Sequence, residues 1–249
     1  TIADTIGIGG IMRGLRTIPV LLDIARDIME VCPKAIWLQY VNPMCSNMIA
    51  INKVFPNIKS IGLCHSVQET IEMLAQDLNE NIDDINFLCA GINHMAFYQK
   101  LVKKSSGEDL YPKLKLIGKK ILKDEILSSR TNKKENYSNK PLHEKVRYEI
   151  LDRLGYFVTE SSEHFAEYVP WFIKKNRVDL IDKYKIPIEE YIDRCELYEN
   201  IWKELDKDIG PIINQPIKRS NEYASYIIDA VTNNNQTSIY GNIMNKKII

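Results

Sequence analysis

The chain has 249 residues, enough for one large domain or two small ones with a substantial buried core. Hydrophobic residues make up 45% of the sequence and charged residues 27%, and no apolar run approaches the roughly 18–20 residues that a membrane-spanning helix needs. The 33 basic residues balance the 33 acidic ones, which argues against nucleic acid as a partner.

The first part of the chain alternates helices with apolar strands, which is typical of an α/β fold. A glycine-rich segment at residues 4–14 is expected to form a loop on the substrate side, because its glycine spacing does not match a dinucleotide fingerprint. Apolar residues at helical spacing predict a helix over residues 17–31, with Pro19 in its first turn. Residues 35–41 predict a buried strand, and residues 46–54 predict a short helix.

Asn42 and Pro43 directly follow the strand predicted over residues 35–41. Two interpretations remain open on these residues alone. A carboxamide after a parallel strand can face a cofactor crevice. An Asn-Pro pair is also a common start of a simple turn.

A thiol and an imidazole end two predicted strands. The apolar run at residues 58–63 leads into Cys64, a helix follows over residues 68–78, and a second strand at residues 85–90 leads to His94. If the two strands are neighbours in one sheet, the thiol and the imidazole meet at the edge where α/β sheets bind ligands. The pair would suit a divalent ion such as Zn, Mn, Fe or Ni. A cysteine after an apolar strand is, however, more often a packed core residue.

The second half of the chain has a different, mixed pattern. Thr159 is the expected N-cap of a short helix, on which Glu160, Glu163, His164 and Glu167 would share one face. The aromatic residues beside this cluster favour a helix that enters the core over a solvated one. The other predicted elements are an extended segment at residues 95–102, helices at residues 110–127, 142–154, 188–205 and 220–231, and a strand near residues 238–243.

Six motifs follow one another in a characteristic order. They are residues 4–19, Val-Asn-Pro-Met at 41–44, Gly-Leu-Cys-His-Ser-Val at 62–67, Gly-Ile-Asn-His-Met at 91–95, residues 155–168 and residues 219–228. Together they resemble glycoside hydrolase family 4, and they are most similar to its α-galactosidase (melibiase) subgroup. The resemblance spans nearly the whole chain.

The resemblance implies an α/β fold with two parts. Residues 1–66 would be the remaining, C-terminal half of a Rossmann-like NAD-binding domain. Residues 67–249 would form a metal- and substrate-binding α+β catalytic domain of the lactate/malate dehydrogenase type. Relatives have a glycine fingerprint ahead of this point and further chain behind it, so we expect the chain to be a fragment.

The resemblance also implies a chemistry unlike that of most glycosidases, which place two carboxylates across the glycosidic bond. With NAD and Mn²⁺ as cofactors, an α-galactoside would be hydrolysed by C3 oxidation, C2 deprotonation, aglycone elimination, water addition and C3 reduction. Cys64 and His94 would hold the metal, whose charge keeps the cysteine as a thiolate. Asn42 would lie at both NAD and the substrate, and Asn93 at the substrate.

Two residues would transfer protons in this scheme. His65 would protonate the leaving group, a task suited to an imidazole near neutral pH. Family members that act on phosphorylated sugars carry Asp at this position, so His65 indicates an unphosphorylated sugar. The family uses Tyr or Asp as the base at C2, and Tyr168 is our choice here. Tyr156 and the glutamates near Tyr168 remain alternatives.

Other functions remain open. The sequence also fits a family 4 α-glucosidase or α-galacturonidase, or a sensor that binds NAD and a sugar without turnover. A 2-hydroxyacid dehydrogenase would share the sheet and Asn42, but it would need an Arg/His pair and has no use for Cys64. The five cysteines lack the spacing of a disulfide framework, which fits a cytoplasmic protein. We expect a homo-oligomer, a dimer or tetramer, with no nucleic-acid or membrane partner.

Overall fold

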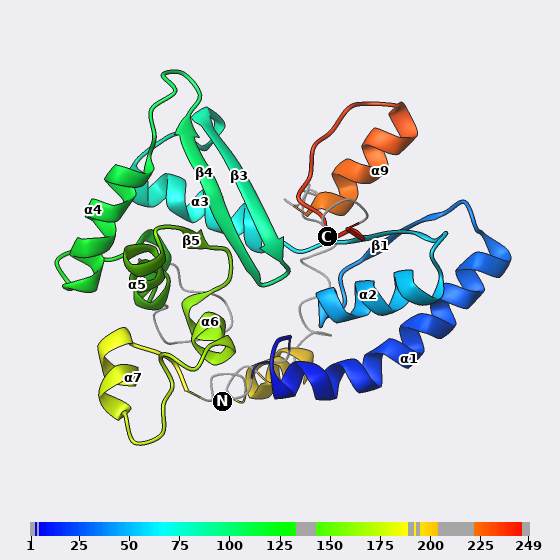
Figure 1. Ribbon diagram of the computed structural model, residues 1–249, viewed down its shortest axis with the longest axis horizontal. Coiled ribbons are helices and arrows are strands. Elements are labelled where there is room, and N and C mark those ends of the chain that lie inside the picture. Colours follow the sequence, from blue (N-terminus) through cyan, green and yellow to red (C-terminus); the bar gives the residue numbers. More distant parts are fainter. Residues whose placement is uncertain are drawn as a thin grey trace.

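The computed structural model describes residue 3 and residues 5–132, 143–188, 192, 195–203 and 222–245. Figure 1 shows an α/β arrangement in which strands β3 to β5 and their helices lie at one end and α1, α2 and β1 at the other. None of the described helices is long and apolar enough to cross a membrane. The elements are α1 (Ile8–Val31), β1 (Ile36–Gln39), α2 (Met44–Val54), β2 (Lys59–Gly62), α3 (Ser66–Leu78), the 3₁₀ turn η1 (Ile82–Asp84), β3 (Ile85–Ile92), β4 (Met95–Lys103), α4 (Tyr111–Leu122), the 3₁₀ turn η2 (Ser129–Asn132), α5 (Lys145–Leu154), β5 (Phe157–Val158), α6 (Ser162–Tyr168), α7 (Val178–Tyr184) and α9 (Tyr223–Asn233).

The first sheet consists of β1 and β2, which run parallel and are joined through α2. Parallel neighbours need such a crossover, which confirms the α/β pattern predicted for this part. Helices α1 and α2 pack together over a small core of Leu21, Ala25, Ile51 and Ile58. Asn242, near the end of the described chain, pairs antiparallel with Gly62 through backbone hydrogen bonds of 2.9 and 2.7 Å.

The second sheet has the order β3-β4-β5 and is antiparallel throughout. Helix α3 covers it with Ile71, Leu74, Ala75 and Leu78, which follow the i, i+3, i+4, i+7 spacing and are at most 4% exposed. Helices α4 and α5 pack against each other beside it. This sheet and its helices contain the largest of the three clusters of buried apolar residues among the described residues.

The two strands predicted to carry the thiol and the imidazole are not neighbours in one sheet, so that prediction was wrong. Strand β2 pairs with β1, whereas β3 pairs with β4. Ile92 lies opposite Met95 in the β3–β4 pair, so the connection between these strands is only two residues long. Such a short connection allows only an antiparallel hairpin, which turns the chain away from β2.

The predicted glycine-rich loop is the first part of α1, which begins at Ile8 and therefore has Pro19 in its interior. Gly10 and Gly14 are both buried in this helix. A Cβ at residue 10 would lie 2.5 Å from the Thr5 carbonyl oxygen, so glycine is required there for close packing rather than for a flexible loop. The following strand, β1, is shorter and more exposed than predicted.

Several predicted boundaries were also wrong. Helix α4 ends at Leu122, and Ser161 rather than Thr159 caps α6, because its side chain accepts a hydrogen bond from the His164 backbone N–H. Helix α5 ends as predicted at Gly155, which has a φ of 84°. The helix predicted at residues 188–205 lies partly outside the described residues. In the part of it that is described, residues 195–203 are helical. Residues 238–243 do not form the predicted strand. They contain a single β-bridge, at Asn242.

Candidate active site

The structure brings Cys64 and His94 into contact although they come from different sheets. Cys64 follows the end of β2, and His94 lies at the tip of the β3–β4 hairpin with a φ of 62°. The Cys64 Sγ atom lies 3.5 Å from His94 Nε2 and 3.4 Å from the Ser66 hydroxyl. Burial raises the pKa of the Cys64 thiol, but the hydrogen bond and charge of His94 outweigh it and lower the pKa to about 7.

The other ring nitrogen of His94 has two polar neighbours. Its Nδ1 atom lies 3.0 Å from the Tyr168 hydroxyl and 3.2 Å from Glu160 Oε2. Burial lowers the pKa of His94, but the Cys64 hydrogen bond and the Glu160 charge outweigh it and raise the pKa. The predicted base Tyr168 therefore contacts the edge of the imidazole that is remote from Cys64.

A cleft of about 530 Å³ opens beside this pair. His65 directly follows Cys64 as the N-cap of α3, and it lines the same cleft. Its walls include most of the residues predicted for the site together with several charged side chains. Its lining includes Asn42, Cys64, His65, Thr70, His94, Arg130, Arg147, Thr159, Glu160, Ser161 and His164.

His65 is the most exposed of the predicted site residues, with 57% of its side chain accessible. Glu69 Oε1 lies 3.8 Å from its Nε2, and Glu222 Oε1 lies 3.5 Å from its Nδ1. The second carboxylate comes from the residue just before α9, far away in the sequence. His65 is thus flanked by two acceptors at the mouth of the cleft.

Three predicted residues do not line this cleft. Tyr168, the predicted base, lines neither this cleft nor the smaller cavity described next, and its hydroxyl contacts His94 instead. Asn93 is 6% exposed and lines a smaller cavity of about 170 Å³, whose walls also include Cys64 and His94. Its Oδ1 atom has no hydrogen-bond partner among the described residues. Tyr156, the alternative base, is 48% exposed and packs edge-on against Tyr111, and it lines neither cavity.

The Cys64–His94 pair has the spacing of two ligands of one metal ion. With metal–ligand distances as in zinc sites and a tetrahedral angle, the sulfur and nitrogen ligands of one ion stand about 3.5 Å apart. No group of three or more His, Cys, Asp or Glu side chains that could hold a metal occurs among the described residues. The pair therefore fits an open site, in which other ligand positions are left to substrate or water.

Family models match almost the whole chain. The model of the family 4 glycosyl hydrolases matches residues 1–80, and that of the family 4 glycosyl hydrolase C-terminal domain matches residues 89–249. The chain belongs to glycoside hydrolase family 4. This confirms the resemblance that the six motifs indicate.

Its family 4 relatives include proteins with several sugar specificities. The chain is 44% identical over all 249 residues to the alpha-galactosidase of Bacillus subtilis (strain 168), of which it covers 53%. It is 32% identical over 264 aligned residues to that of Rhizobium meliloti (strain 1021), covering 100% of this chain and 49% of the relative. An alpha-galacturonidase of Thermoanaerobacter italicus (strain DSM 9252 / Ab9) is 30% identical to the chain. The alignment covers 83% of this chain and 46% of the length of that protein. The chain spans about half the length of these curated relatives.

Solved family 4 structures confirm the predicted α/β fold, with a Rossmann-like part followed by a catalytic domain. The putative glucosidase lplD from Bacillus subtilis superposes with a TM-score of 0.74 at 26% identity, over 91% of this chain and 52% of that one. A 6-phospho-alpha-glucosidase from gut microorganisms, in complex with NAD and Mn²⁺, superposes with a TM-score of 0.69 at 20% identity. The match covers 94% of this chain and 52% of that one.

Arg147 was not predicted as a site residue, although it lies in the wall of the cleft and is 1% exposed. Its position on α5 could have indicated that it is buried. Arg147 precedes Ile150 and Leu151 by three and four residues on α5, and both are buried. A charged residue on the apolar stripe of a helix is buried together with that stripe. Such a residue therefore needs several hydrogen-bond or ion-pair partners.

Proposed function

We propose that the protein to which this chain belongs hydrolyses α-galactosides by an NAD- and Mn²⁺-dependent redox-elimination reaction. The observation that carries the proposal is the 3.5 Å contact between Cys64 and His94 in a cleft that also includes Asn42 and His65. The 44% identity with an alpha-galactosidase supports the sugar, and the likeness to a structure in complex with NAD and Mn²⁺ supports the cofactors.

In this proposal Cys64 and His94 hold the ion through Sγ and Nε2. NAD⁺ and Mn²⁺ would supply an acceptor for the hydride of C3 and a Lewis acid for the C2 and C3 oxygens. The pKa of the Cys64 thiol is lowered to about 7, and the charge of a bound cation would lower it further, so Cys64 can act as an anionic ligand. Asn42 binds both NAD and the sugar, and Asn93 binds the sugar. The NAD-binding part, residues 1–66, then meets the catalytic part, residues 67–249, at this site.

The proton transfers use the two remaining site residues. With C3 oxidised to a ketone, Tyr168 removes the proton from C2, and the electron pair of that C–H bond is delocalised onto the C3 oxygen as an enediolate. In the next step the C3 carbonyl re-forms and the C1–C2 double bond forms as the C1–O bond breaks, and His65 gives its proton to the departing oxygen. Water then adds across the double bond, and C3 takes back the hydride. The exposure of His65 at the cleft mouth suits a group that must reach an aglycone.

Hydrolysis of nitrophenyl α-galactoside by the full-length protein tests this function. We expect turnover with NAD⁺, Mn²⁺ and thiol together, and loss of turnover when NAD⁺ or the metal is removed by dialysis against a chelator. Undiminished hydrolysis without NAD⁺ would contradict the redox route. Binding of NAD⁺ and galactoside without any turnover would indicate a sensor instead.

A family 4 α-galacturonidase is the second candidate, because relatives with this activity are 30% and 34% identical to the chain. They align with 83% and 70% of it, whereas the B. subtilis alpha-galactosidase aligns with all of it at higher identity. Nitrophenyl α-galacturonide and α-glucoside in the same assay distinguish the sugars. We expect the galactoside to have the highest kcat/KM.

His65→Ala should impair substrates with poor leaving groups far more than activated ones. General-acid catalysis is typically worth ~10²–10⁴-fold, and an aryl oxide of low pKa needs little of it. The measurement is the ratio of the rates on melibiose and nitrophenyl galactoside, together with exchange of the C2 proton in D₂O, which should persist.

The matched control is His143→Ala, because His143 does not line the cleft. It should leave the ratio of the two rates unchanged. Equal losses on both substrates in His65→Ala would assign His65 a structural or metal-binding role. Absence of C2 exchange in the wild type during turnover would count against the whole scheme.

A further inference from the structure

Glu160 contacts the edge of the His94 imidazole opposite to Cys64. Glu160 Oε2 lies 3.2 Å from Nδ1, while Nε2 faces the Cys64 sulfur at 3.5 Å. The side chains of His94 and Glu160 are only 12% and 10% exposed, so water competes little for this contact. The three groups form a line of carboxylate, imidazole and thiol across the junction of the two sheets.

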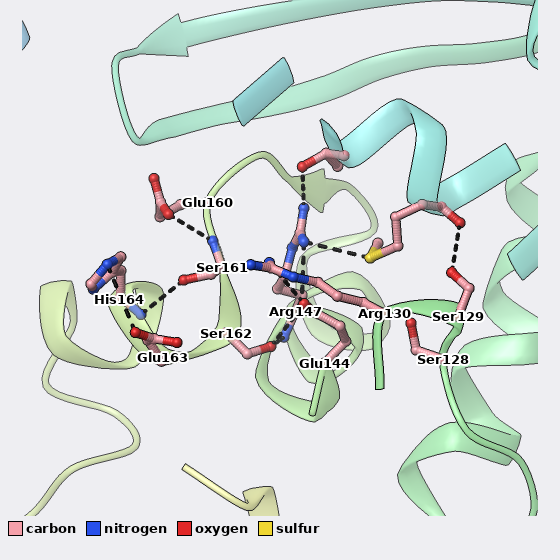
Figure 2. Close-up of polar contacts among 12 residues, drawn as sticks. Ser128, Ser129, Arg130, Glu144, Arg147, Glu160, Ser161, Ser162, Glu163 and His164 are labelled. Atoms are coloured by element: carbon pink, nitrogen blue, oxygen red, sulfur yellow. Dashed lines mark hydrogen bonds and ion pairs between the residues drawn. The ribbon is translucent and has the colours of Figure 1, made fainter. Parts of the chain in front are cut away.

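The carboxylate of Glu160 is oriented by its own backbone neighbourhood. The Ser161 N–H donates a 2.9 Å hydrogen bond to Oε1, as Figure 2 shows, and this leaves Oε2 for His94. Ser161 also caps α6 through its hydroxyl group, so its backbone is fixed by the start of the helix. Glu160 is therefore held immediately before α6, not on its face.

A buried arginine anchors the segment that leads to Glu160. Arg147 donates to the Val158 carbonyl oxygen at 2.9 and 3.2 Å and to that of Thr159 at 3.2 Å. It also donates to the Thr70 hydroxyl at 2.6 Å, and this hydroxyl donates to Thr159 O at 2.8 Å. These contacts tie the end of β5 to α3 and α5 just before Glu160, around the arginine at the centre of Figure 2.

We propose that Glu160 is a positioning residue that selects the tautomer of His94 in which Nε2 can bind the metal ion. A carboxylate only accepts hydrogen bonds, so it requires the imidazole proton on Nδ1. A neutral imidazole has one N–H, and the lone pair is then left on Nε2, which faces Cys64. The inference rests on the proposed function, since it requires an ion between His94 and Cys64. Partners of this kind orient metal-binding histidines generally.

Tyr168 cannot make this selection, although its hydroxyl lies 3.0 Å from the same Nδ1. A phenol both donates and accepts, so it is compatible with either tautomer. Of these two described neighbours of Nδ1, Glu160 is the one that discriminates between the tautomers. The role differs from that of a base at C2, for which a glutamate near Tyr168 is also a candidate, because a base would not alter the affinity for the metal.

Titration of the metal-free, full-length protein with Co²⁺ tests the proposal. Glu160→Ala should weaken Co²⁺ binding about 10–100-fold, the usual effect of losing such a partner. Glu160→Gln keeps the size, but its amide both donates and accepts, so a loss near the lower end of that range is expected. The matched control is Glu167→Gln, which removes the same charge from a residue whose carboxylate contacts His164 at 3.0 Å. It should bind Co²⁺ like the wild type.

Cys64→Ser in the same titration separates the two proposals. If it binds Co²⁺ as tightly as the wild type, the metal site itself is wrong. If Cys64→Ser loses binding while both Glu160 variants keep wild-type affinity, only the role of Glu160 is overturned. Wild-type affinity together with lost exchange of the C2 proton would make Glu160 the base instead. If a thermal melt shows that Glu160→Ala does not fold, the Co²⁺ affinity of Glu160→Gln decides alone. A wild-type Co²⁺ affinity in that variant then overturns the proposal.

Discussion

Replacing Cys64 by Ser in the full-length protein is expected to lower α-galactoside hydrolysis at least about 10³-fold, and to reduce bound Mn²⁺ to background. A serine hydroxyl is not ionised at neutral pH, whereas the Cys64 thiol has a pKa of about 7. The ion would lose one of its two protein ligands, and with it several kcal/mol of charge stabilisation, where about 1.4 kcal/mol corresponds to a tenfold change in rate. His94→Ala should have the same effect. The measurements are kcat/KM and the metal content after dialysis.

The matched control is Cys45→Ser, which changes a half-buried cysteine of α2 that lines neither the cleft nor the smaller cavity. Burial raises the pKa of this thiol, so it stays protonated and offers no ligand at neutral pH. The activity of Cys45→Ser should remain within about twofold of the wild type, because a change in activation free energy well below 1.4 kcal/mol alters the rate by much less than tenfold. Wild-type activity and metal content in Cys64→Ser would remove the metal site from the proposal.

Arg147→Met should destabilise the protein by about 3–5 kcal/mol, the usual effect of removing one partner of a buried ion pair. Glu144 is 1% exposed and would lose the guanidinium that lies 3.4 Å from its Oε2, although Arg130 still reaches its Oε1 at 3.0 Å. The carbonyl groups of Val158 and Thr159 would lose donors as well. The guanidinium also lies over the Phe157 ring, 4.7 Å from its centre. Urea unfolding of the full-length protein measures the change.

A methionine in place of an exposed arginine provides the control. Arg26→Met removes a side chain of α1 that is 62% exposed and pairs at 2.7 Å with Asp23, which is 70% exposed. Exposed pairs of this kind contribute about 0.2–1 kcal/mol, so stability should hardly change. If Arg147→Met is as stable as Arg26→Met, the buried network does not hold the end of β5 in place.

The contact between Cys64 and His94 was predicted from the sequence, but through the wrong sheet. Apolar runs predict that strands exist, and both β2 and β3 do. They say nothing about which strands pair, because pairing depends on the connection that follows. Here Asn93 and His94 alone join β3 to an extended segment, and a two-residue connection between strands already implies a hairpin.

The role of Glu160 was hidden by a shift of two residues at a helix start. With Thr159 as the N-cap, Glu160 would be the first helical residue and would share a face with His164. With Ser161 as the N-cap, Glu160 lies outside the helix and reaches His94 instead. Helix periodicity places residues within a helix well, but Thr159, Ser161 and Ser162 are all acceptable caps. Tertiary hydrogen bonds to Thr159, from Thr70 and Arg147, decide among them.

Because Cys64 and His94 come from separate sheets, an ion held in the proposed site would also join the two halves of the described chain. Ligand binding favours the conformation that binds it, by about 2.7 kcal/mol when the free ion is at 100 times its Kd. Metal occupancy and the relative orientation of the sheets are then thermodynamically linked. Any change that separates β2 from the β3–β4 hairpin would then release the ion, and binding of the ion would in turn restrain the movement of one sheet relative to the other.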